Sequence, residues 1–167
     1  MAIVHKLFSD DEEKKAYEKV DYQLIAIHST LEDYRLAYYI NQNLPINLQK
    51  GNCNIQISNK QGETQFTRFV FEDAKDITWN LVQNQNVDFV PSEVSNQGLF
   101  AESSNKFSTK IYLIPEYKKV DYFLKIGNGE VHIDISKITN CIKKIDRVST
   151  VYTVDVEKIK SKNNLIF

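Results

Sequence analysis

The sequence predicts a single α+β domain in which a mostly antiparallel sheet carries two helices. Short apolar runs, each broken by polar residues, fill residues 50–114, which is typical of a central β meander. A strand followed by a helix is predicted on each side of that region, in pseudo-repeats at about 17–48 and 117–156. The chain has 167 residues, 42% of them hydrophobic, which is enough to form one core over 1–167.

The first strand–helix unit has the clearest boundaries. Residues 20–27 are rich in β-branched and aromatic side chains and predict a half-buried strand. A helix is predicted from residue 31 to about residue 43, with Ser29 or Thr30 as its N-cap and Pro45 beyond its end.

The central region predicts short strands joined by turns. Its apolar residues recur at every second position in runs such as 55–57, 69–71 and 77–81. Polar tetrapeptides at 59–62 and 83–86 predict hairpin turns between neighbouring strands. Residues 92–109 are rich in Ser and Asn and predict a loop.

The last third of the chain repeats the opening plan. A strand is predicted at 120–126, a tight turn at 127–129, a helix at about 135–146 and a final strand at 148–156. Four isoleucines fall on one narrow stripe of that helix, which predicts that it lies on a sheet: Ile135, Ile138, Ile142 and Ile145.

The two strand–helix units also resemble each other in sequence. Residues 17–24 and 117–124 are identical at six of eight positions, at an offset of one hundred residues. We interpret this as an internal duplication that gives a pseudo-symmetric pair of units. The alternative is that this tetrapeptide, Lys-Val-Asp-Tyr, is simply a good strand entrance in a lysine-rich chain.

The segment 114–122 reads IPEYKKVDY. It resembles the signature of the IPExxxVDY family, small cytoplasmic bacterial proteins associated with Bacteroidetes, and all six signature positions match. The likeness extends to 33–41 in the first predicted helix and to 160–167 at the end of the sequence. The resemblance implies a bacterial cytoplasmic protein and carries no activity with it.

Composition excludes several classes of function. Lys and Arg number 21 against 22 Asp and Glu, so the formal charge is −1 and no bulk cationic field favours nucleic acid or a membrane. No apolar stretch is long enough for an export signal or a membrane span, so we expect a cytoplasmic protein without membrane association. Cys53 and Cys141 form neither a metal nor a redox motif and predict two buried thiols.

Glu116 and Asp121 are the carboxylates that most invite a chemical role, since paired carboxylates serve acid–base catalysis or bind divalent ions. Five residues apart in an extended segment, they would be separated by more than about 10 Å. We therefore expect Glu116 to accept hydrogen bonds from loop amides and Asp121 to pair with Arg35 or a lysine. The alternative is a pocket for a small ligand or an enzymatic substrate, formed by the candidate residues Trp79, Pro115, Glu116, Asp121 and Tyr122.

No motif for catalysis or cofactor binding is found. No Gly-x-Ser-x-Gly elbow and no glycine-rich phosphate loop occurs, and neither cysteine has a context that would activate its thiol. His28 and His132 lack partners at a metal-ligand spacing. We therefore predict no catalytic residue, no cofactor and no metal, and lean against an enzyme.

The first predicted helix has apolar residues on more than one face. Leu36, Ala37 and Ile40 share one side, whereas Tyr34 and Tyr38 lie on the other, together with Leu31 and Tyr39. The tyrosine face either packs against the second half of the same chain or contacts another subunit or protein. We therefore expect a non-catalytic protein-binding or regulatory module, or self-association. The candidate surface is the helix face at Tyr34, Arg35 and Tyr38, and the alternative surface is the loop from Glu116 to Tyr122.

A third alternative is RNA binding by the basic end of the sequence. From residue 110 onward, 11 basic residues stand against 7 acidic ones. RNA surfaces need aromatic side chains among their basic residues, and Tyr152 alone offers little stacking area. We do not expect nucleic acid to be the partner.

Overall fold

The computed structural model describes residues 20–59, 62–90, 107–127 and 132–167. Within them the chain forms ten β-strands and two α-helices, and most strands belong to one antiparallel sheet, which confirms the predicted α+β class. No helix in these ranges is long and apolar enough to cross a bilayer.

The main sheet has six strands, and every neighbouring pair in it is antiparallel. β1 and β9 are neighbouring interior strands, and their predicted boundaries are shifted by only one or two residues. The strand order is β10 (Val148–Val154), β1 (Tyr22–Ser29), β9 (Tyr122–Gly127), β6 (Thr78–Gln83), β5 (Arg68–Glu72) and β2 (Gln49–Lys50).

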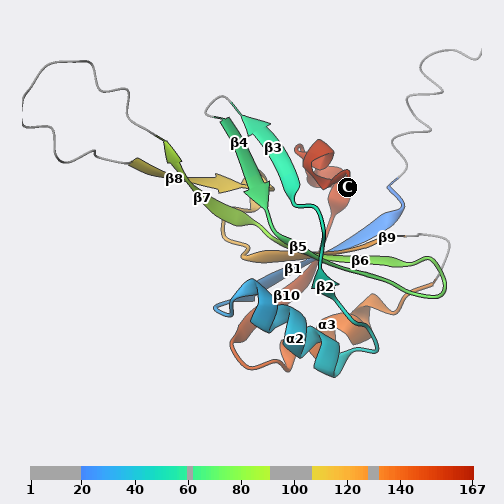
Figure 1. Ribbon diagram of the computed structural model, residues 1–167. Coiled ribbons are helices and arrows are strands. Elements are labelled where there is room, and N and C mark those ends of the chain that lie inside the picture. The colour runs from blue at the N-terminus through green and yellow to red at the C-terminus, as the bar shows by residue number, and fades with distance from the viewer. Residues whose placement is uncertain (1–19, 60–61, 91–106, 128–131) are drawn as a thin grey trace, which may run out of the picture.

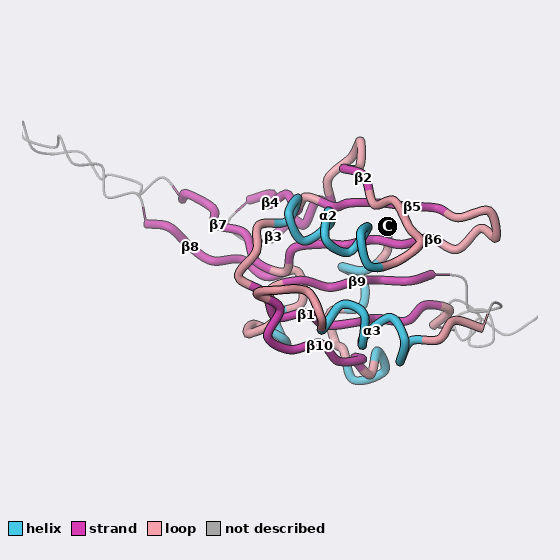
Figure 2. Tube along the Cα trace, turned by 90° about the horizontal axis from the view of Figure 1, so that it is seen from below, coloured by secondary structure: helices cyan, strands magenta, loops and turns pink. Residues whose placement is uncertain are grey.

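Both helices cover one face of this sheet (Figures 1 and 2). α2 (Asp33–Asn43) buries Leu36, Ala37 and Ile40, and α3 (Ile135–Lys143) buries Ile138 and Ile142 in the same core cluster. Ile145 is also buried and Ile135 half-buried, so the isoleucine stripe lies where it was predicted.

The predicted N-cap of the first helix is wrong. α2 starts at Asp33, Glu32 occupies the N-cap position, and its side chain accepts no capping hydrogen bond. The Ser29 hydroxyl instead accepts a bond of 3.1 Å from the amide of Leu31, before the helix begins. Leu31 precedes α2 and is buried in the core, so it is not part of the tyrosine face.

A second core lies on the opposite face of the sheet, under the C-terminal segment. The side chain of Lys125 in β9 lies on this face, and its ammonium group donates to the carbonyl oxygens of Leu165 at 2.6 Å and Phe167 at 3.5 Å. Its ammonium also lies 4.5 Å from the ring centre of Phe167. Three short 3-10 helices complete this layer: η1 (Pro115–Tyr117), η2 (Val156–Lys158) and η3 (Lys162–Leu165).

The central region departs from the predicted meander. β3 (Ile55–Asn59) pairs with β4 (Gly62–Phe66), and β7 (Gln85–Val90) pairs with β8 (Phe107–Tyr112), in two separate two-stranded sheets. Figure 1 shows both projecting from one side of the main sheet. Residues 83–86 are not a hairpin turn, because β6 pairs with β5 and β9 and the chain leaves the main sheet at the buried Asn84.

Three smaller predictions have different outcomes. Cys53 is exposed and Cys141 is half-buried, so the expectation of two buried thiols is wrong. The loop predicted at 92–109 lies mostly outside the described residues, and its last three residues belong to β8. The two strand–helix units are neighbours, since β1 pairs with β9 and each strand is followed in sequence by a helix on the same face. Their origin by duplication stays a prediction.

Candidate functional site

The IPEYKKVDY segment is held in place by Asn84, whose side chain is fully buried. Its amide nitrogen donates to the carbonyl oxygens of Tyr117 at 2.9 Å and Val120 at 3.0 Å. Its amide oxygen accepts from the backbone of Ile114 at 2.8 Å. The Asn84 backbone amide also donates to the Asp121 carbonyl oxygen, and the Asn84 carbonyl oxygen accepts from the Leu113 amide, both at 2.8 Å. Asn84 therefore fixes the conformation of the whole segment.

The Glu116 carboxylate ties this segment to the C-terminal region. It accepts hydrogen bonds from the backbone amides of Lys160 at 2.7 Å and Ser161 at 2.8 Å, and from the Ser161 hydroxyl at 2.7 Å. Burial raises the pKa of Glu116, but these donors outweigh it and hold the pKa below its ordinary value. The predicted acceptance of loop amides is confirmed, and a carboxylate so occupied is a poor general base.

Asp121 has a structural partner other than the predicted one. Its carboxylate accepts a hydrogen bond of 2.9 Å from the backbone amide of Ser29, at the end of β1. The expected pairing with Arg35 or a lysine is wrong, since the ion pair found among the described residues joins Lys158 and Asp155. Asp121 thus joins β9 to the turn that leads into α2.

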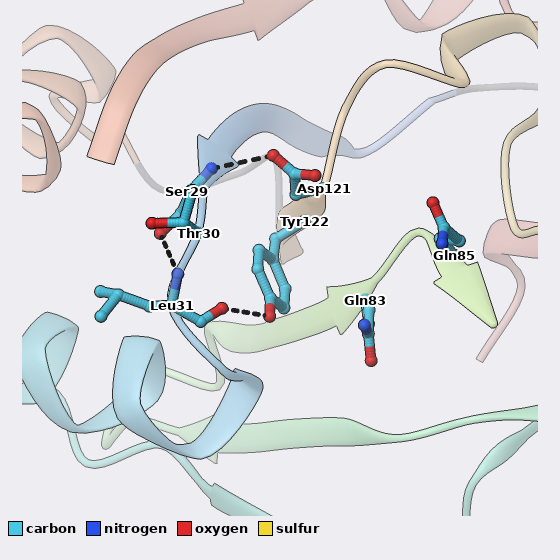
Figure 3. A pocket seen from close by; sticks show the side chains of 7 residues that line it. All are labelled: Ser29, Thr30, Leu31, Gln83, Gln85, Asp121 and Tyr122. Carbon is cyan, nitrogen blue, oxygen red and sulfur yellow. Dashed lines mark hydrogen bonds between the residues drawn. The ribbon is translucent and has the colours of Figure 1, made fainter. Parts of the chain in front are cut away.

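Tyr122 reinforces the same junction from the next position. Its hydroxyl donates to the Leu31 carbonyl oxygen at 2.6 Å, as Figure 3 shows. Burial, helped by the negative charges of Asp33, Asp121 and Glu32, raises the pKa of Tyr122 to about 12. The residue stays neutral at physiological pH and works as a hydrogen-bond donor.

The structure does not gather the predicted pocket residues into one cavity. Trp79 is buried in the core beneath the helices. Pro115 and Glu116 line a cavity of about 360 Å³ together with Tyr152. Asp121 and Tyr122 line a different one, of about 160 Å³. Glu116 and Asp121 therefore line separate cavities, and Trp79 lines neither of these two.

The cavity at Asp121 is polar (Figure 3). Gln83 and Gln85 from β6 and β7 form one wall, and Thr30 lies opposite beside the end of β1. Amide, hydroxyl and carboxylate groups can hydrogen-bond a small polar molecule, but the described lining holds no nucleophile paired with a base. This lining suits the binding of a small polar molecule.

The outward face of α2 carries three large aromatic side chains in contact with solvent. The exposed fractions are 58% for Tyr34, 59% for Tyr38 and 40% for Tyr39, and Arg35 between them is also exposed. The rings of Tyr38 and Tyr39 meet edge to face with centres 5.5 Å apart. The alternative in which the chain itself covers this face is therefore wrong for the described residues.

The tyrosine face is partly ordered by its own contacts. The Tyr34 hydroxyl donates to the Glu32 carboxylate at 2.5 Å, and this bond raises the pKa of Tyr34. Arg35 and Tyr39 also border a cavity of about 120 Å³ with Asp146 and Arg147. Exposed tyrosine and arginine side chains held in defined positions are typical of protein interfaces.

Arg147 has a backbone conformation that favours glycine, with φ at 65°. This conformation turns its carbonyl oxygen toward the end of β1, where it accepts from the Thr30 amide at 3.3 Å and the Ser29 hydroxyl at 3.1 Å. The cost of the unusual φ is offset by these bonds. Arg147, like Asn84, was not identified from the sequence, because both act through partners at least 29 residues away.

Metal binding has no support among the described residues, where no group of three or more His, Cys, Asp or Glu side chains converges. His28 stacks on Tyr152, with ring centres 5.8 Å apart. The fold and these surfaces define a small α+β domain with an exposed tyrosine-bearing helix and polar cavities. No protein-family model, curated protein or solved structure shows a significant match to the chain.

Proposed function

We propose that the protein is a non-catalytic protein-binding module of the bacterial cytoplasm, and that its interaction surface is the exposed face of α2. The membership in the IPExxxVDY family that residues 114–122 suggest is part of this proposal.

One observation carries the proposal: Tyr34 and Tyr38, one helical turn apart, expose more than half of their surface. An isolated exposed aromatic residue is ordinary, but here Tyr34 and Tyr38 share one side of a short helix and the ring of Tyr39 touches that of Tyr38. Tyrosine combines a large apolar area with a polar tip and loses little rotamer freedom on binding, so such a patch favours a protein partner.

The opposite face of α2 supports the same conclusion. Leu36 and Ile40 are fully buried, so the helix is anchored to the sheet along its length. A rigid helix presents its side chains with little ordering cost on association. The bonds of Asp121 and Tyr122 to the turn before α2 fix where this helix begins. On this reading, the signature residues position the binding surface and do not form it.

Affinity capture from lysate of the source organism tests the proposal with matched variants. The first bait carries Tyr34→Glu and Tyr38→Glu, which place two charges in the centre of the surface. The control bait carries Ser136→Glu and Asn140→Glu, two exposed positions with the same spacing on α3. We expect a stoichiometric partner that the control retains and the tyrosine variant loses. Equal capture by both baits would contradict the proposal.

A second candidate function is small-ligand binding in the cavity at Asp121. It is favoured by the convergence of Gln83, Gln85 and Asp121 on a space of about 160 Å³. A ligand bound there raises the melting temperature by mass action. A thermal-shift screen of polar metabolites, repeated with Gln83→Ala, tests it: stabilisation that the variant loses supports this function, and a flat screen opposes it.

A further inference from the structure

We propose that two copies of this chain associate through the free edge of β10, pairing antiparallel with Tyr152 opposite the same residue of the second copy. The two main sheets would then form one continuous sheet. This surface is separate from the tyrosine face of α2, so the inference does not depend on the proposed function.

β10 is the last strand of the main sheet (Figure 2). It pairs with β1 on one side, and residues 150–154 make no backbone hydrogen bond to any other described segment. An edge strand directs about half of its backbone N–H and C=O groups away from its single neighbour. These groups form a ready template for another strand.

The chemistry of this edge favours pairing. Residues 150–154 read TVYTV, with no charge and no proline, and all five are β-branched or aromatic. Thr150, Tyr152 and Thr153 are exposed. The opposite edge of the sheet is different: β2 has only two residues, and one of them is Lys50. Short strands and lysines are the usual protection against pairing, and residues 150–154 have neither a charge nor a proline to provide it.

The segment is also complementary to itself. In an antiparallel pair centred on Tyr152, Val151 lies opposite Thr153 and Thr150 lies opposite Val154. The two outer pairs join β-branched side chains, and the central pair joins two tyrosines. Both kinds of cross-strand pair are favourable. A two-fold axis through the pair makes the interface isologous, the commonest arrangement in homodimers.

A bulge limits how far this pairing extends. His28 pairs with Thr150 and Ser29 pairs with Val148, so Ser149 is the additional residue on β10. Bulges twist a strand away from a straight edge. The regular part of β10 is therefore 150–154, and its middle residue is Tyr152. The short length predicts an association that depends on protein concentration.

Sedimentation equilibrium of the full chain tests the proposal. We expect the wild-type protein to pass from monomer to dimer as its concentration rises. Tyr152→Lys and Tyr152→Glu should each weaken the dimer by at least about tenfold, because like charges would face each other across the axis. An equimolar mixture of the two variants should restore the dimer, because opposite charges then meet. Tyr152→Phe and Tyr34→Lys should dimerise like the wild type.

Three results would overturn the proposal: a wild-type protein that stays monomeric at every concentration, charged variants that dimerise normally, or a mixture that stays monomeric. A fourth result, loss of the dimer in Tyr34→Lys, would also overturn it, because the interface would then lie on α2. Thermal melting verifies that each variant is folded. If a charged Tyr152 variant melts early, the double variant Thr150→Lys and Thr153→Lys replaces it: both positions are exposed on the same edge, and lysines there should likewise abolish the dimer.

Discussion

Replacing Asn84 by Ala should destabilise the protein more than any other single change at a polar residue of the IPEYKKVDY junction. The Asn84 side chain is fully buried and makes three hydrogen bonds to the backbone of that segment. The variant leaves the Ile114 amide and the Val120 carbonyl without the Asn84 side chain as their partner, whereas the Tyr117 carbonyl keeps a bond of 2.9 Å from the Val120 amide.

The magnitude follows from these two orphaned groups. Each buried backbone group that loses its partner costs about 1–3 kcal/mol, so the two groups together should lower the free energy of unfolding of Asn84→Ala by about 2–6 kcal/mol. Since a domain of this kind has a total stability of about 5–15 kcal/mol, the loss is a large fraction of it. Urea unfolding followed by circular dichroism measures the difference.

Gln83→Ala is the matched control. Gln83 precedes Asn84, is half-buried, and belongs to the wall of the polar cavity. Its backbone pairs with Tyr122, but its side chain makes no hydrogen bond to the segment. We expect its unfolding free energy to stay within about 1 kcal/mol of the wild type. If Asn84→Ala also stayed within that limit, Asn84 would not be what holds the segment, and our reading of the signature as a structural junction would be refuted.

Three further predictions concern the same framework. Because the pKa of Tyr122 is raised to about 12, the Tyr122 hydroxyl contributes about 2–3 kcal/mol of stability that is fully present below pH 10.0 and is lost as the pH rises toward 12. The Tyr122→Phe variant should lack this loss when its unfolding is followed at alkaline pH. Because the pKa of Glu116 is lowered, its contribution is present above pH 4.5 and lost as the pH falls further; Glu116→Gln should flatten the acid side of a stability profile measured in urea. Lys125→Met should release the segment that carries Leu165 and Phe167, which hydrogen exchange would report as faster amide exchange at 159–167 with little change in the central strands.

The fold could be predicted where local pattern determines structure. Alternating apolar residues located β3, β5 and β6, and the isoleucine stripe located α3, since periodicity depends only on the segment itself. The polar pattern gave a wrong prediction at residues 83–86. Four consecutive polar residues are typical of a turn, but Asn84 is buried because it bonds to residues within 113–121. No local signal specifies such partners.

In the candidate sites, too, local features were predictable from the sequence and distant partners were not. The acceptance of loop amides by Glu116 was predicted from its place in the segment after Pro115. The partner of Asp121 was not, because Ser29 is 92 residues away and donates through its backbone, which any residue type could do. A helical wheel placed Tyr34 and Tyr38 on one face, but only the arrangement of the sheet and α3 reveals that this face stays uncovered by the described chain.

The most direct test of the α2 surface is site-specific photo-crosslinking in cells of the source organism. A benzophenone side chain at position 38 lies in the middle of the proposed surface, and the same group at Asn140 on the exposed face of α3 serves as the control. Our account predicts a discrete crosslinked product with another protein at position 38 and none at position 140. The absence of any product at position 38, or the same products at both positions, would contradict the claim that α2 is the interaction surface.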